Sequence, residues 1–136
     1  MSIIVMKSYT DIEQSKKLAE ILPIKSADME YLVIKENGAL VGAVPFVKDD
    51  SEVEDSAYNH TYDRIACWSL AALLGVIPKH IKDYNVLRID IAEDDFAIWY
   101  DEIGYGVNND LPDITMKSAV DACVAMIERL HELKKL

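Results

Sequence analysis

The dipeptide Asn37-Gly38 constrains the fold of this chain more than any other feature, because it separates two runs of strand-forming residues. Asparagine and glycine readily adopt the positive φ angles of a two-residue hairpin turn. Tyr31–Ile34 is rich in branched and aromatic residues, and Ala39–Val44 can return beside it as the paired strand. We expect Pro45 to end this hairpin, since a proline inside a paired strand removes a ladder hydrogen bond.

A second hairpin is predicted nearer the C-terminus. Val86–Ile91 alternates apolar and polar residues from Leu87 onward, and Phe96–Tyr100 returns after the acidic turn Glu93-Asp94-Asp95. The segment that follows, Gly104–Asp113, has the composition of a loop. Its two glycines lack the spacing of a phosphate-binding loop, so no nucleotide site is predicted there.

The first helix is expected over Asp11–Leu22. Thr10 and Glu13 stand three residues apart, the spacing at which a cap hydroxyl and a returning carboxylate satisfy each other's free amides. Pro23 should end the helix, because it lacks an amide hydrogen and disfavours helix in the residue before it.

The last helix is the longest, and either Thr115 or Ser118 can cap it. Its apolar stripe continues almost to the end of the chain and comprises Ala119, Ala122, Cys123, Met126, Leu130 and Leu133. Together with a short middle helix, the order of elements predicts an α+β fold for a single domain, residues 1–136. We expect a small antiparallel sheet built from the two hairpins, with the helices packed on one face.

The stretch Cys67-Trp68-Ser69 precedes an apolar run and raises the question of a reactive thiol. Ser69 is a favoured helix cap, Pro78 can close the far end, and Trp68 is placed to pack onto the first turn toward Leu73. The run between them has the apolar spacing of one helix face at Leu70, Leu73, Leu74 and Ile77. A thiol at a helix start can be activated, but the chain offers only His60, His80 and His131 as bases and no glycine-rich oxyanion segment. We therefore predict that Cys67 is a buried structural cysteine and assign no catalytic residue.

The acidic balance of the chain argues against nucleic acid as a partner. It has 24 Asp and Glu residues against 14 Lys and Arg, a formal net charge of −10, which repels phosphate backbones and anionic membrane surfaces. The two cysteines show no metal or redox spacing, and no apolar run is long enough to span a bilayer. These features predict a soluble, cytoplasmic protein without a cofactor.

The segment Asp49–Asp55 carries five carboxylates in seven residues and is predicted to be an exposed loop. Clustered carboxylates raise the question of calcium, but the segment lacks the central glycine and the terminal glutamate of an EF-hand loop. No metal site is assigned here.

Three blocks of the sequence carry a resemblance, namely YTDIEQSKKLAEILPIKSADMEY, CWSLAALLGVIP and SAVDACVAMIERLHELKKL. In content and order they resemble a family of short uncharacterised proteins from gut anaerobic bacteria and their phages or mobile elements. The segment Leu32–Arg64 does not match and is interpreted as a variable insertion. The resemblance implies a shared scaffold, and it implies no activity, cofactor or catalytic residue.

The leading hypothesis for function is a non-enzymatic protein-interaction or accessory protein of a phage or mobile element. The binding candidates are Trp99, Tyr100 and Tyr105, because tryptophan and tyrosine dominate binding hot spots. Trp99 and Tyr100 should point to opposite faces of a strand, so that at most one of them lies in the core. Two alternatives remain. One is a small enzyme that uses Cys67 or the carboxylate pair Asp94 and Asp95, and the other is an acidic mimic of DNA.

Overall fold

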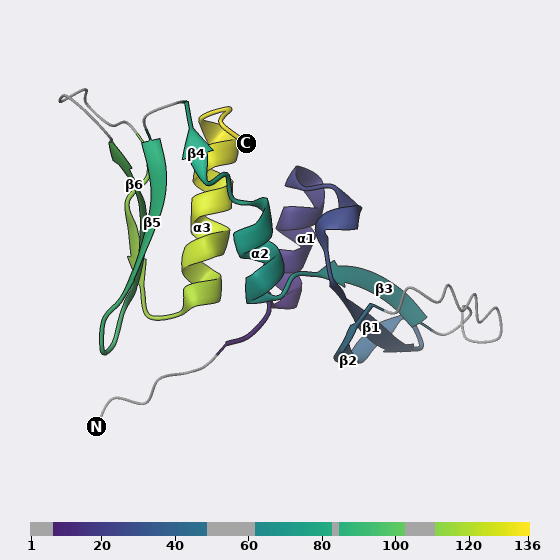
Figure 1. The fold of residues 1–136 in the computed structure, drawn as a ribbon. Helices are drawn as coiled ribbons and strands as arrows, with labels where there is room; N and C mark the ends of the chain where they lie inside the picture. Colours follow the sequence, from purple (N-terminus) through teal and green to yellow (C-terminus); the bar gives the residue numbers. More distant parts are fainter. Residues whose placement is uncertain (1–6, 49–61, 83–84, 103–110) are drawn as a thin grey trace.

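The structure is a computed structural model that describes residues 7–48, 62–82, 85–102 and 111–136 of the 136-residue chain (Figure 1). Helices and antiparallel strands are both present, so the predicted α+β class is confirmed. In chain order the elements are α1 (Ile12–Ile21), the 3-10 helix η1 (Ile24–Ser26), β1 (Met29–Glu36), β2 (Ala39–Val47), β3 (Tyr62–Cys67), α2 (Leu70–Val76), β4 (His80–Ile81), β5 (Asn85–Ile91), β6 (Phe96–Glu102), β7 (Ile114–Met116) and α3 (Ala119–Glu132).

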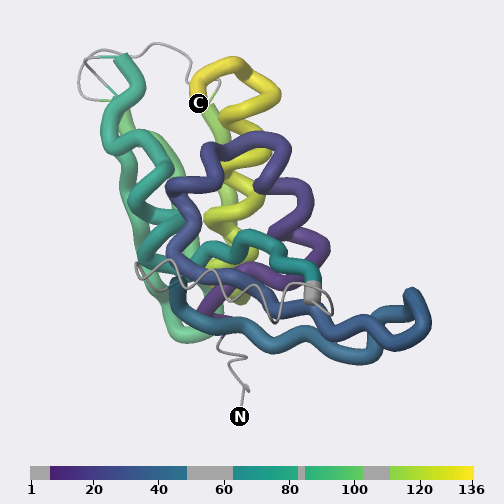
Figure 2. Tube along the Cα trace, turned by 90° about the vertical axis from the view of Figure 1, so that its right-hand side faces the viewer, coloured from purple at the N-terminus to yellow at the C-terminus, as the bar shows by residue number. Residues whose placement is uncertain are grey.

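The two predicted hairpins lie in two separate antiparallel sheets, not side by side in one. The first sheet has the strand order β2-β1-β3 and the second has the order β4-β5-β6-β7. The described helices lie between the two sheets and cover one face of each (Figure 1). In the perpendicular view of Figure 2, the hairpin of β1 and β2 projects beyond the helices. In the first sheet β1 is the central strand, with β2 on one side and β3 on the other.

The turn between β1 and β2 has the geometry that its sequence predicts, with φ of 53° at Asn37 and 79° at Gly38. The prediction that Pro45 ends the hairpin is wrong, because β2 continues to Val47 and Pro45 lies opposite Tyr31. The reason is the position of β2 at the edge of the sheet, where a proline can turn its nitrogen away from the neighbouring strand.

Three strands were not predicted from the sequence, and all three are short or pair with residues distant in the chain. β3 pairs with β1, β4 with β5, and β7 with β6. Thr115, one of the two predicted caps, lies within β7, so Ser118 alone caps α3 and accepts from the Asp121 backbone N–H.

The first helix begins one residue later than the predicted capping box implies. Asp11 is the cap, and it exchanges hydrogen bonds with Gln14 in place of the predicted exchange between Thr10 and Glu13. Thr10 is fully buried beside β3 and is therefore unavailable as a cap.

The other two helices match their sequence patterns. The hydroxyl of Ser69 accepts from the Ala72 backbone N–H at the start of α2, as predicted. The stripe of α3 is buried at Ala122, Cys123, Met126 and Leu130. These residues pack with Trp68 and Leu73 in the main core, which lies between the helices and the second sheet.

Candidate functional site

The cysteine that the sequence singled out lies in a buried polar cluster formed by Thr10, Ser15, Tyr31 and Cys67. The Thr10 hydroxyl lies 2.8 Å from the Ser15 hydroxyl and 3.6 Å from the Cys67 sulfur. The Tyr31 hydroxyl donates to the Thr10 carbonyl over 2.7 Å, and the thiol approaches the same carbonyl at 3.5 Å. Thr10 precedes α1, Ser15 lies within α1, and Tyr31 and Cys67 come from β1 and β3 of the first sheet.

The chemistry of the cluster does not favour a nucleophile. Burial raises the pKa of Cys67, and hydrogen bonds with the side chains of Thr10, Ser15 and Tyr31 lower it by less. Burial also raises the pKa of Tyr31. The thiol is therefore neutral near pH 7, whereas the thiolate is the reactive form. His80 and His131 are exposed on other elements, and His60 lies outside the described residues.

Cys123 is equally inert. It is fully buried in α3, and burial raises its pKa to about 12. Both cysteines are free thiols, and both contribute to packing.

The three predicted binding residues have different environments. Tyr100 is 2% exposed and donates to the Pro78 carbonyl over 2.7 Å, which makes it a core residue and not a contact for a partner. Tyr105 lies outside the described residues. Trp99 is partly exposed, so only one of the two neighbours Trp99 and Tyr100 lies in the core, as expected.

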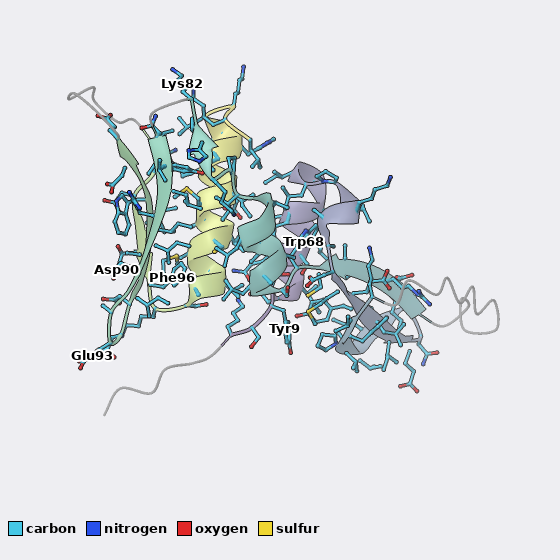
Figure 3. All side chains as sticks on the ribbon, in the orientation of Figure 1. Tyr9, Trp68, Lys82, Asp90, Glu93 and Phe96 are labelled. Atoms are coloured by element: carbon cyan, nitrogen blue, oxygen red, sulfur yellow. The ribbon has the colours of Figure 1, made fainter. Side chains whose placement is uncertain are left out.

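Trp99 lies on the face of the second sheet that is turned away from α3. Strand pairing places Arg88 directly opposite Trp99 on that face, whereas Phe96, Ile98 and Tyr100 point to the core. Figure 3 shows Phe96 on the side of α3 and Asp90 on the opposite side. We call the residues Arg88, Asp90, Ala97, Trp99 and Asp101 the anchor face.

Two hydrogen bonds fix the geometry at the centre of the anchor face. The Trp99 indole donates to one carboxylate oxygen of Asp101 over 2.9 Å, and Arg88 Nε donates to the other over 3.3 Å. Asp101 thus holds the indole and the guanidinium together while both remain accessible to solvent. The sequence analysis missed Arg88 and Asp101. The four-residue turn between Ile91 and Phe96 could have revealed them, since it sets which residues of β5 and β6 face each other.

The predicted carboxylate pair Asp94 and Asp95 is exposed in the turn between β5 and β6. Adjacent carboxylates in an exposed turn are usually solvated. The acidic segment Asp49–Asp55 lies outside the described residues. Within the ranges that the structure describes, no three His, Cys, Asp or Glu side chains are grouped so that they could hold a metal ion.

An open hollow of about 330 Å³ lies between α1 and α3. Lys7 occupies its wall, where its ammonium lies 2.9 Å from carboxylate oxygens of both Asp11 and Asp121. Burial alone would lower the pKa of Lys7, but these two carboxylates outweigh it and raise the pKa. One ammonium faces two carboxylates, so Lys7, Asp11 and Asp121 together keep one net negative charge in this part of the wall.

Comparison with protein-family models, curated proteins and solved structures gives no significant match. Among the helices in the described part of the chain, none combines the length and the apolar character that crossing a bilayer requires.

Proposed function

We propose that this chain is a non-enzymatic accessory protein of a phage or mobile element of gut bacteria, and that it acts by binding another protein. The observation that carries the proposal is the pre-oriented Trp99 on a sheet face that no described helix covers. The enzyme alternative has less support, because the Cys67 thiol is buried and neutral and the Asp94–Asp95 pair is exposed.

The composition of the anchor face supports protein binding. Tryptophan and arginine are enriched in hot spots, and hot spots are usually surrounded by polar residues that exclude water. Here a tryptophan and an arginine stand at the centre, with Asp90 and Asp101 beside them. Because Asp101 already holds the indole, less side-chain entropy is lost when a partner orders it.

The charge of the chain indicates which kind of partner suits this face. A protein with a formal net charge of −10 attracts a positively charged surface over long range. The indole N–H is already satisfied by Asp101, so the partner needs to supply an apolar pocket for the ring. We therefore expect a protein that presents an apolar pocket bordered by lysine or arginine.

Affinity capture from a gut anaerobe that carries the gene, followed by calorimetry with the purified partner, tests the proposal. Replacing a hot-spot residue costs about 2 kcal/mol or more, so Trp99→Ala should weaken binding about 30-fold. Ile91→Ala is the control, because it removes an exposed apolar side chain from the same hairpin but on the other face. The proposal fails if no protein is captured stoichiometrically, or if the two variants bind equally well.

The DNA-mimic alternative predicts a different pattern in the same assay. A nucleic-acid-binding protein would be captured, Trp99→Ala would leave its affinity unchanged, and about 0.5 M salt would release it. That result would replace the anchor face with the acidic surface as the binding site.

A further inference from the structure

The strand β2 exposes apolar side chains on both faces of the first sheet. Val44 and Phe46 lie on the outer face, opposite Leu32 and Glu30, and are 53% and 36% exposed. Val47 lies opposite Met29 on the face that packs on α1, and it is 72% exposed. A partner placed flat on one face would cover only part of this surface, whereas a strand placed alongside β2 would contact both faces.

The backbone of β2 can accept such a strand, because no described strand pairs with its second edge. Lys48 donates its N–H toward β1, to the Asp28 carbonyl over 2.9 Å. Since the direction of the backbone groups alternates along a strand, the N–H and C=O groups of Ala43 and Val47 point outward. Pro45 belongs to the same outward set, and it contributes a carbonyl but no donor.

We propose that β2 pairs antiparallel with β2 of a second copy of this chain around a two-fold axis. Antiparallel pairing of identical strands is the arrangement that a two-fold axis produces, so Ala43 of each copy can bond to Val47 of the other. This proposal does not depend on partner binding by the anchor face, which lies on the other sheet.

The distribution of charge favours contact between two copies along β2 over contact elsewhere on their surfaces. Two molecules with a formal net charge of −10 repel each other. Residues 37–47 contain no charged side chain, and Glu36 and Lys48, which flank them in the sequence, have opposite charges. On the neighbouring strands Lys35 is paired with Asp63, and Arg64 with Glu30. Two copies can therefore meet along β2 without bringing like charges into contact.

The size of the contact predicts a weak dimer. The regular part of β2, from the bulge near Leu40 to Val47, is about 20 Å long. One added strand pair of this length buries less than the roughly 1,200 Å² that stable interfaces require. The missing donor at Pro45 weakens the pair further, as prolines on natural sheet edges do.

Sedimentation velocity of the full chain between about 10 μM and about 1 mM tests the proposal. We expect the mass to rise from one chain toward two over this range. Val44→Lys and Val47→Lys should each weaken the dimer at least about tenfold, because lysine on an edge strand opposes pairing. Ile91→Lys places the same charge at an exposed apolar site on the other sheet and should change nothing. Pro45→Ala restores two hydrogen bonds per dimer and should tighten it about tenfold.

Circular dichroism of each variant tests whether the substitution leaves the fold intact. A mass of one chain at every concentration overturns the proposal. So does an effect of only one of the two lysine variants, which would indicate docking on a single face, and so does an unchanged affinity in Pro45→Ala.

Discussion

Removing the hydroxyl of Thr10 should destabilise the protein more than the size of the change suggests. Thr10 is fully buried, and its hydroxyl accepts from the Trp68 backbone N–H over 3.1 Å and pairs with the Ser15 hydroxyl. Thr10→Val keeps the shape of the side chain but leaves the Trp68 backbone N–H and the Ser15 hydroxyl without this partner. A buried group that loses its hydrogen bond costs about 1–3 kcal/mol, so we expect a loss of about 2–5 kcal/mol in the free energy of unfolding.

A double-mutant cycle with Ser15→Ala shows whether the hydrogen bonds cause that loss. Once Thr10→Val has removed its partner, Ser15 is a buried hydroxyl, and replacing it with alanine removes the unpaired group. The double variant should therefore be at least about 1 kcal/mol more stable than the sum of the two single effects predicts. Thr10→Ser, which keeps the hydroxyl and loses one methyl group, should cost only about 1 kcal/mol.

Urea unfolding followed by tryptophan fluorescence measures all four variants, since Trp68 lies in the core. Two results would refute the reasoning. One is a Thr10→Val protein within about 0.5 kcal/mol of the wild type, and the other is strict additivity of Thr10→Val and Ser15→Ala.

Three further predictions concern the core, the first helix and the thiols. In urea unfolding, Leu73→Ala should cost about 2–5 kcal/mol, and Leu74→Ala should cost less because Leu74 is only partly buried. Burial alone would raise the pKa of Asp11, but the Gln14 backbone N–H and the Lys7 ammonium outweigh it and hold the pKa below its usual 3.8. Asp11 therefore stabilises the fold above pH 3.8 and loses this effect as the pH falls, so thermal unfolding of Asp11→Asn should depend less on pH in that range. Cys67 and Cys123 should resist a thiol reagent near pH 8 until the protein unfolds, and labelling of the native protein at the rate of a free thiol would contradict their burial.

The candidate site could be predicted from the sequence only in part. The strand pattern places Trp99 and Tyr100 on opposite faces, but it leaves open which of the two is buried. The packing of α3 against β6 decides that question, because it buries Tyr100 and leaves Trp99 accessible. The exposure of the apolar residues of β2 could not be predicted either. An apolar run in a sequence does not show whether its strand lies at the centre or at the edge of a sheet.

The sequence by itself determined those features whose causes act within a few residues. Asn37-Gly38 sets its turn through backbone sterics, Ser69 caps α2 through its own hydroxyl, and the 3.6-residue period selects the buried side of α3. Only the tertiary structure decided the rest. β3 pairs with β1, although β2 and residues 48–61 lie between them in the sequence, and the burial of Thr10 moves the cap of α1 to Asp11. These outcomes depend on contacts between residues that are distant in the chain, and no local pattern specifies which distant surfaces meet.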